Sequence, residues 1–400
     1  MIFFLIAFSI LSAFYGYIGW RLIIPAGLSM PWNLVLWIVL FLFMLMPFIS
    51  ILIRIAGYNP GWINIFSWIA YLSLGFFSLV FVFLFARDFV QSVVFILQKA
   101  AGIAYSFINP EVQSPDPVNP DRHRFLVNAF NMVTLGAAGL LSGYGLYEAR
   151  RSQRIVEVTI PLKNLPHDLD GFRIVQITDI HVGPTIKRGY VQKIVDKVNS
   201  LEKDTIVLTG DLVDGLVQNL RDDVAPLAEL SAPGGMYFVT GNHEYYSGVE
   251  AWIEEVKRLG FTVLLNEHTI LKHGDGRILL AGVTDFDGGH MNKIHVSSPE
   301  AALSGAPPND VKILLAHQPR SIFKASQAGF DLVLSGHTHG GQYFPWNYLV
   351  YLQQPYNSGL HKHDNTWIYV SKGTGYWGPP LRIGRPSEIT VITLSAVSFE

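Results

Sequence analysis

The chain lacks cysteine entirely and has few charged residues for its length. With no cysteine among its 400 residues, disulfide bridges, thiolate metal sites and cysteine nucleophiles are excluded. Charged residues make up 15% of the sequence and apolar residues 50%, whereas a soluble protein carries about 25% charged residues. The formal net charge of −2 gives no basis for binding nucleic acid. At this length two or more folding units are expected, and at least one of them does not face water.

The scarcity of charge is confined to the first part of the chain. Of the 60 Asp, Glu, Lys and Arg residues, 12 lie in residues 1–150 and 48 in residues 151–400. Histidine is divided in the same way, because only His123 precedes residue 150 and the other 12 histidines follow it. We therefore predict an α-helical membrane module in residues 1–150 and a water-soluble domain in residues 155–400.

Four segments of the first part are long and apolar enough to cross a bilayer as helices. We predict these spans at about residues 2–20, 32–53, 62–86 and 125–146. Residues 88–108 place apolar side chains on one helical face, which indicates an amphipathic helix at the membrane surface. A fifth span is the alternative for this segment.

The basic residues around the spans hardly decide which side of the membrane the soluble domain occupies. With the N-terminus outside, the inner loops hold five Lys and Arg residues and the outer side holds four. The segment Arg122-His-Arg-Phe-Leu126 resembles a twin-arginine export signal in which His123 replaces the second arginine. We therefore expect a multi-pass protein of the cell membrane whose C-terminal domain is extracytoplasmic.

Short β-branched runs alternate with helical or loop segments from Ile155 onward, which is typical of an α/β domain. Five of these runs are followed directly by Asp, Asn or His. The residues at these five strand ends are Asp179 with His181, Asp211, Asn242 with His243, His317, and His337 with His339. The carboxyl ends of strands are where ligands collect in open α/β sheets, so we expect these side chains to form one site.

The residue types at this site suit a pair of divalent metal ions. Imidazole, carboxylate and amide groups without thiolate suit Mn, Fe or Zn. Seven candidate ligands fit two ions that share a carboxylate, an arrangement that can generate hydroxide and hold a phosphoryl group during displacement. Gly210, Gly241 and Gly336 each precede a candidate ligand, where we expect the chain to turn tightly.

The motifs in this order resemble those of the calcineurin-like metallophosphoesterase superfamily. They are Asp179-Ile-His181, Gly210-Asp211-Leu-Val-Asp214, Gly241-Asn242-His243-Glu244, the single His317, and Gly336-His337-Thr-His339, within about residues 170–395. Three further segments are similar to its bacterial membrane-associated branch: 178–183, 335–342 and 373–382. The four-span form also resembles the animal transmembrane proteins with a metallophosphoesterase domain. The resemblance implies a four-layer α/β/β/α sandwich with a dinuclear site at one edge.

The resemblance also implies a role for each motif residue. Asp179, His181 and His339 would hold the first metal, Asn242, His317 and His337 the second, and Asp211 would bridge them. His243 would protonate the leaving oxygen or stabilise the transferring phosphoryl group, and Glu244 would orient its imidazole. The nucleophile would be a metal-bound hydroxide. Asp214 is expected to fix its loop rather than to bind metal.

Aromatic residues beside the motifs indicate an apolar rim for substrate or membrane. We predict substrate contacts for Tyr245 and Tyr246, for Trp346, and for Arg382, whose charge suits a phosphate.

Taken together, the sequence predicts a membrane-anchored, metal-dependent phosphoric ester hydrolase. The substrate is a phosphorylated small molecule or lipid, and a lipid or lipid-linked ester fits the tethering and the rim. Membrane lipids are the other expected partner. One alternative is a pyrophosphohydrolase of nucleotide-linked lipids, similar to the UDP-diacylglucosamine hydrolases, which would act on the cytoplasmic face. Another is a transporter or sensor that only binds a phosphorylated ligand, although the spans contain almost no ionisable residues.

Overall fold

The computed structural model describes residues 2–108, 119–163 and 165–396, and the chain forms two compact units. The first unit comprises residues 1–51 and 69–144, and the second comprises residues 52–68 and 145–400. The connection between the second and third predicted spans, with their ends, thus belongs to the same unit as the water-soluble domain. This division differs from a simple boundary near residue 150, because the segment packs against the soluble domain.

Four helices form the apolar part of the chain. They are α1 (Ile2–Ala26), α2 (Met30–Ile55), α3 (Ile63–Ile108) and α4 (Pro120–Arg150). Within the described residues, these four are the helices long and apolar enough to cross a membrane. Each of the four predicted spans overlaps one of these helices, and whether the helices cross a membrane stays a prediction.

Helix α3 is longer than the predicted third span because it does not stop at Ala86. Its 46 residues correspond to about 69 Å, roughly twice the hydrocarbon thickness of a bilayer. No proline interrupts it, so nothing in the sequence forces a break. The segment 88–108 is therefore the continuation of α3, and its amphipathic role at the membrane surface stays a prediction.

Helix α1 contacts the other three helices of the first unit. The Ser12 Oγ donates to Met44 Sδ on α2, the rings of Phe14 and Phe81 on α3 stack 4.7 Å apart, and the Asn131 Nδ2 on α4 donates to the Arg21 carbonyl. Aromatic stacking and a few polar contacts thus join helices whose surfaces are otherwise apolar.

A charged cluster also joins helices of the first unit. The Asp88 carboxylate on α3 accepts hydrogen bonds from the Tyr17 hydroxyl at 2.6 Å, from Arg21 Nη2 at 2.6 Å and from Arg87 Nε at 2.8 Å. Arg87 Nη1 donates in turn to the Asn131 Oδ1 at 2.9 Å. Each charge is therefore paired, which offsets the cost of placing it beside apolar helices.

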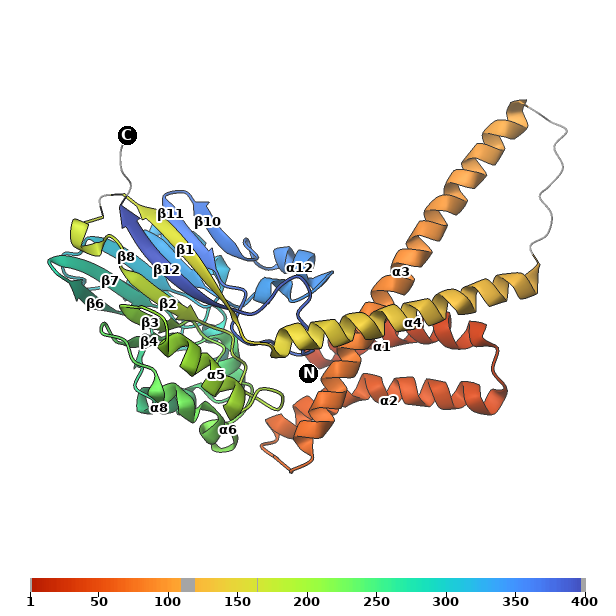
Figure 1. The fold of residues 1–400 in the computed structure, drawn as a ribbon, viewed down its shortest axis with the longest axis horizontal. Helices are drawn as coiled ribbons and strands as arrows, with labels where there is room; N and C mark the ends of the chain where they lie inside the picture. The colour runs from red at the N-terminus through yellow and green to blue at the C-terminus, as the bar shows by residue number, and fades with distance from the viewer. Residues whose placement is uncertain (1, 109–118, 164, 397–400) are drawn as a thin grey trace. The chain divides into compact units, whose positions relative to one another are not determined.

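The second unit contains two six-stranded sheets (Figure 1). In spatial order, the first sheet holds β1 (Arg154–Leu162), β12 (Glu388–Ala396), β2 (Arg173–Ile177), β3 (Thr205–Leu208), β4 (Met236–Phe238) and β5 (Thr262–Val263). The second holds β10 (Gly359–His363), β11 (Thr366–Val370), β9 (Leu332–Ser335), β8 (Val311–Leu315), β7 (Gly276–Gly282) and β6 (Glu267–His273).

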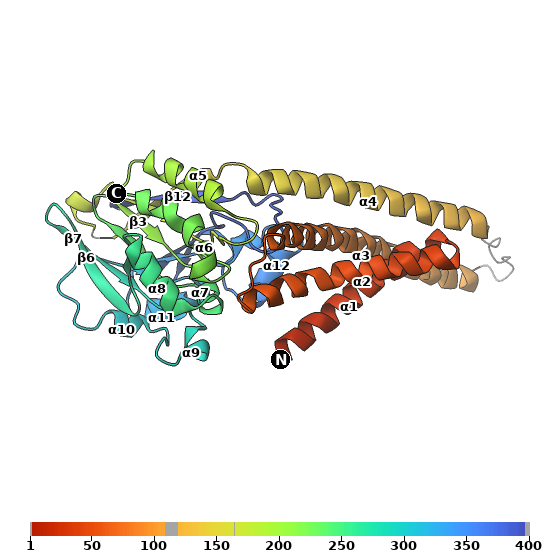
Figure 2. The same ribbon diagram turned by 90° about the horizontal axis from the view of Figure 1, so that it is seen from below.

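Helices cover the outer face of each sheet. Helices α5 (Arg188–Asn199), α6 (Val217–Val224) and α8 (Val249–Arg258) lie on the first sheet, and α10 (Pro299–Ala302) and α11 (Ile322–Gln327) on the second (Figure 2). The remaining short helices are α7 (Asn242–Tyr246), α9 (Gly288–Met291), α12 (Trp346–Leu349), η1 (His167–Leu169), η2 (Ala225–Glu229), η3 (Pro319–Ser321), η4 (His339–Gly341) and η5 (Val350–Leu352).

Three apolar cores separate the layers and confirm the predicted α/β/β/α sandwich. The central core lies between the sheets, where Ile174 and Val207 of the first sheet meet Ile313 and Leu332 of the second. The outer cores lie under the covering helices. Because both faces of the central strands are covered, their sequences are continuous β-branched and aliphatic runs rather than alternating ones.

Parallel pairing brings the carboxyl ends of the central strands to one edge of each sheet. Strands β2, β3 and β4 are parallel in the first sheet, and β7, β8 and β9 are parallel in the second. The Gln176 Nε2 of β2 donates to the Ser335 carbonyl of β9 at 3.0 Å, and both groups are buried. This bond joins the two edges where the candidate site residues leave the strands.

Candidate metal centre

The loops that follow β2 and β3 run side by side. The backbone amides of Asp179, His181 and Val182 donate to the carbonyls of Gly210, Asp211 and Leu212. This short ladder extends the parallel pairing of β2 and β3 beyond the sheet. It places Asp179 and His181 beside Asp211, so these three side chains lie close together, as the sequence predicts.

Five of the seven predicted metal ligands have a left-handed backbone conformation, which is uncommon for residues other than glycine. Their φ angles are 53° for Asp179, 55° for His181, 53° for Asp211, 70° for His337 and 52° for His339. Non-glycine residues are held in this region only where the surrounding structure fixes them, and such residues cluster at functional sites. The strain is therefore localised where the candidate ligands leave the strands.

The glycines before the ligands are required by close packing, as the sequence predicts. A Cβ on Gly336 would lie 2.1 Å from Asp179 Oδ2, and one on Gly241 would lie 2.2 Å from Asp211 Oδ1. Gly210 has a φ of 88°, and its Cβ would lie 2.6 Å from the Gly241 nitrogen. Any side chain at these positions would displace a candidate ligand or the backbone beside it.

The first cluster of candidate ligands consists of Asp179, His181 and His339, all buried. The His181 Nε2 lies 3.0 Å from the His339 Nε2, which lies 3.5 Å from Asp179 Oδ1. The Asp179 carboxylate is fixed from behind by the His337 backbone amide and the Thr178 hydroxyl. The three ligand atoms therefore face a common point.

The second cluster consists of Asp211, His317 and His337. The His317 Nε2 lies 3.0 Å from Asp211 Oδ2 and 3.2 Å from the His337 Nδ1. The His317 Nδ1 donates to the Thr209 carbonyl at 2.8 Å, so Nε2 is the nitrogen directed at the site. Asp211 Oδ2 is also 3.8 Å from the His181 Nε2 of the first cluster, so one carboxylate faces both groups.

The side chains of this site fit two divalent ions. Ligand atoms about 2.1 Å from one ion lie roughly 3 to 3.5 Å apart, as the nitrogen and oxygen atoms do within each cluster. The Asn242 Oδ1 is buried and has no hydrogen-bond partner among the described residues. A buried amide oxygen that has no protein donor can coordinate a metal ion. The residues present thus fit divalent ions, and the seven-residue ligand set and its assignment to individual ions stay predictions.

The electrostatics of the site also favour a cation. Burial raises the pKa of the Asp179 carboxyl, which has no Lys or Arg partner in the described structure. Burial also opposes the ionisation of Asp211, but the neighbouring His317 and His243 hold its pKa well below the usual range. A divalent ion between the clusters would supply the positive charge that buried carboxylates need.

His243 is held by Asp214, a contact that the sequence analysis did not assign. The His243 Nδ1 lies 2.5 Å from Asp214 Oδ1, and the His181 Nδ1 lies 3.3 Å from the same oxygen. Burial lowers the pKa of His243, but the carboxylates of Asp211 and Asp214 outweigh it and raise this pKa to about 9. The signal for this contact in the sequence is the second aspartate of the motif Gly-Asp-x-x-Asp, since Asp214 follows Asp211 by three residues and lies in the same loop.

Glu244 has a different place from the one predicted. Its fully buried carboxylate accepts hydrogen bonds from the backbone amides of Gly241, Asp211 and Leu212 at 2.7 to 2.9 Å. It therefore fixes the loops that carry Asp211 and Asn242. The predicted role in orienting the His243 imidazole does not agree with this geometry, because Asp214 occupies that position.

Arg382 also differs from its prediction as a phosphate contact. Its side chain is fully buried and donates to the carbonyls of His339, Lys372, Arg385 and Gly375. Its Nη2 lies 3.0 Å from the His339 Nδ1. A guanidinium bound in this way is not available to a substrate, and it braces the loop of a candidate metal ligand instead.

The predicted aromatic rim is only partly assembled around His243. Tyr246 lies beside the imidazole, with ring centroids 5.3 Å apart, and Trp377, which was not predicted, lies 5.5 Å away on the same ring. Both aromatic side chains are more than half exposed. Tyr245 points elsewhere, because its hydroxyl lies 3.0 Å from the His295 Nδ1. Trp346 lies on α12, close in sequence to His339 and partly exposed.

Replacing Gly336 by Ala is expected to weaken the first metal site. The new Cβ would overlap Asp179 Oδ2 and Thr178 Oγ1, so we expect a loss of metal affinity of about 10- to 100-fold. Metal content measured by elemental analysis of the dialysed protein checks this. Gly189→Ala is the matched control, because its Cβ meets open space on α5. Equal metal retention in both variants would contradict the placement of Asp179 in the site.

Comparisons with known proteins place these residues in a family. Residues 172–341 match the family model of the calcineurin-like phosphoesterases. The chain is 41% identical over 271 residues to a transmembrane protein with metallophosphoesterase domain from Danio rerio, covering 66% of this chain and 62% of that protein. It is 37% identical over 343 residues to a protein of the same name from Bos taurus, covering 83% and 74%.

A bacterial relative is also a metallophosphoesterase by name. An uncharacterized metallophosphoesterase from Helicobacter pylori strain 26695 is 38% identical over 325 residues, which cover 79% of this chain and 83% of that protein. A region that covers 79% of this chain extends beyond residues 172–341, which match the family model. With the two clusters and the sandwich that carries them, these similarities establish that the chain belongs to the calcineurin-like metallophosphoesterase family and is a membrane-linked phosphoesterase.

Proposed function

We propose that this phosphoesterase hydrolyses a phosphate ester on a lipid or lipid-linked molecule, with two divalent ions held by the two clusters. The observation that carries the proposal is the single carboxylate of Asp211, which faces both clusters while His243 stands beside them. Asp179, His181 and His339 would hold one ion, and Asn242, His317 and His337 the other. When bound, the ions would supply a nucleophilic water of lowered pKa and charge for the phosphoryl oxygens.

His243 acts in this proposal as the proton donor to the leaving oxygen. With a pKa raised to about 9, the imidazole is protonated at neutral pH. The Asp214 carboxylate accepts from Nδ1 and so leaves Nε2 directed toward the site, 4.0 Å from Asp211 Oδ2. The His243 side chain is 14% exposed, which gives a leaving group access to it.

Two features support a lipid substrate. The described part of the chain has four helices apolar enough to hold it in a membrane. The exposed aromatic rings of Tyr246 and Trp377 flank His243, so a leaving group would pass an apolar surface on its way to the proton donor. Aromatic side chains of this kind suit acyl or polyprenyl chains and the membrane interface.

The test is product identification with the full chain in detergent and with Mn, Zn or Fe restored. We expect hydrolysis that falls by about 100-fold or more in His243→Ala and in Asp211→Asn, because each removes a group that acts on the reacting phosphate. His273→Ala is the matched control, since this half-exposed histidine lies outside the clusters. Full turnover in His243→Ala or Asp211→Asn would refute the catalytic assignment. Cleavage of bis-p-nitrophenyl phosphate, with every phospholipid and polyprenyl phosphate left intact, would refute the lipid substrate.

We propose further that the phosphoesterase domain lies outside the cytoplasm, and the absence of cysteine makes this testable. Lys257→Cys places one thiol on the exposed face of α8. We expect a membrane-impermeant maleimide to label it in intact cells. Ser29→Cys, in the loop between the first two spans, lies on the opposite side of a four-span protein and should be labelled only after permeabilisation. The reverse pattern would place the active site in the cytoplasm and favour the nucleotide-lipid hydrolase.

A further inference from the structure

An exposed apolar segment directly follows the candidate metal ligands. Residues 344–352, here called the apolar shelf, include α12 and η5, and residues 343–360 contain no charged side chain. The exposed side chains are Phe344 (56%), Trp346 (46%), Tyr348 (64%), Leu349 (44%), Tyr351 (57%) and Leu352 (81%). A soluble surface rarely gathers so many large apolar groups without a partner.

The backbone of the shelf is fixed although its side chains face outward. The Asn357 Nδ2 donates to the Asn347 carbonyl at 2.8 Å. Gly341 packs so closely that a Cβ there would lie 2.2 Å from the Asn347 Cα. The shelf is therefore a supported element and not a loose loop that could fold its apolar side chains inward.

The shelf is also connected to the end of the last apolar helix. The Gln342 carbonyl, just before the shelf, accepts from the Ile383 amide, and the adjacent Arg382 amide donates to the Gly145 carbonyl of α4. Residues 145–150 of α4 belong to the same compact unit as the shelf. The partner that the fold keeps beside this unit is thus the membrane that α4 crosses.

We propose that the apolar shelf inserts into the surface of the bilayer. Tryptophan and tyrosine prefer the level of the lipid headgroups, and phenylalanine and leucine the upper acyl region. The shelf combines these four residue types and has no charge that would oppose insertion. The proposal goes beyond the hydrolytic function and holds whatever ester is cleaved, because it concerns contact with the membrane and not the substrate.

The test uses Tyr348→Cys and, as a second position, Leu352→Cys, each labelled with bimane in the full chain reconstituted in phosphatidylcholine–phosphatidylglycerol vesicles. We expect a blue-shifted emission and at least a twofold quenching by brominated lipid, with little quenching by aqueous iodide. Lys257→Cys, on α8, is the matched control and should show the reverse.

Two outcomes would overturn the proposal. Quenching of the shelf labels by iodide and not by lipid would show that the shelf faces water. Shielding from both quenchers, together with crosslinking between chains, would show that a second copy covers it. Neither outcome depends on whether the protein hydrolyses any ester.

A separate observation concerns the helix end that precedes the α2–α3 connection. The Arg54 Nη1 donates to the Asp214 carbonyl at 3.0 Å, and the Asp214 amide donates to the Val182 carbonyl at 2.8 Å. The peptide groups on both sides of the Asp214 side chain are therefore fixed. That side chain is the one that holds the His243 imidazole.

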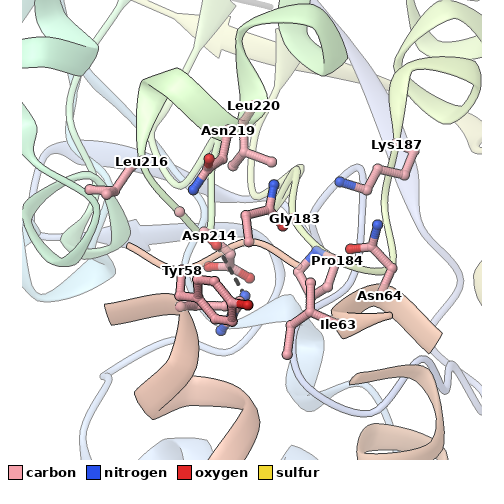
Figure 3. Close-up of a pocket in the computed structure, with 13 residues that line it drawn as sticks. Tyr58, Ile63, Asn64, Gly183, Pro184, Lys187, Asp214, Leu216, Asn219 and Leu220 are labelled. Carbon is pink, nitrogen blue, oxygen red and sulfur yellow. Dashed lines mark hydrogen bonds between the residues drawn. The ribbon is translucent and has the colours of Figure 1, made fainter. Parts of the chain in front are cut away.

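Tyr58 of the α2–α3 connection and the first two residues of α3 complete the surroundings of this contact. Tyr58, Ile63 and Asn64 face Gly183 and Asp214 across a small cavity of about 30 Å³ (Figure 3). A space of this size holds one or two water molecules and not a substrate. The residues that line this cavity therefore belong to the structure that supports the Asp214 loop.

We infer that Arg54 is a positioning residue for the proton donor, acting through Asp214 on His243. This inference rests on the proposed role of His243. If Arg54 is lost, the Asp214 carbonyl loses this donor, and the same peptide group is held by the bond from the Gly215 amide to the Ser247 Oγ at 3.0 Å. The Asp214 side chain is then held less firmly, and with it the direction of the His243 imidazole. Because Asp214 Oδ1 also lies 3.3 Å from the His181 Nδ1 of the first cluster, metal content is measured beside kcat, which separates a loss of metal from a loss of proton donation.

The test compares Arg54→Gln with Arg54→Lys, which keeps a donor, in the full chain with metal content measured. We expect kcat to fall about 10- to 100-fold in Arg54→Gln, with KM unchanged and partial recovery in Arg54→Lys. The loss should be larger for phenyl than for p-nitrophenyl esters, because a poor leaving group depends more on protonation. Asn64→Ala, which lines the same cavity, is the control and should retain activity.

An equal loss for both leaving groups, or a loss confined to KM, would overturn the inference. Failure of the proposed function itself is distinguishable, because the unaltered chain would then hydrolyse neither ester.

Discussion

The structure depends on one geometric constraint, which is that a single carboxylate, that of Asp211, must face two clusters whose members come from both sheets. The histidines at 317 and 337 follow strands of the second sheet, whereas Asp179 and Asp211 follow strands of the first. The carboxyl ends of the strands of both sheets must therefore lie at the same edge of the sandwich. The central core and the Gln176 bond keep them there, and the three amides bound by Glu244 fix the Asp211 loop.

Most of this arrangement could be predicted from the sequence because the chemistry is local to strand ends. A buried parallel strand is a continuous apolar run, and the polar residue that ends it is visible directly after it. The motifs from Asp179 to His339 could be recognised in this way, as could the glycines that give them room. The four apolar helices follow from hydropathy alone, because the length needed to cross a bilayer is fixed.

The remaining features depend on which side chain reaches which partner, and a sequence does not determine this. Glu244 follows His243 directly in the chain and Asp214 lies 29 residues before it, yet the fold directs Asp214 to the imidazole and Glu244 to backbone amides. Arg382 has the charge expected of a phosphate ligand, yet tertiary packing buries it beside His339. The continuation of α3 past Ala86 was missed because polar residues after that point resemble a helix end.

The inclusion of residues 52–68 in the phosphoesterase unit has a consequence for the order in which the protein is made. This segment leaves the ribosome long before residues 145–400, and it is inserted with the first helices. Residues 52–68 are therefore already synthesised when the rest of their unit emerges, and that unit is complete only when residues 145–400 pack with them. A chain synthesised from residue 150 onward would contain every metal ligand and still be an incomplete domain.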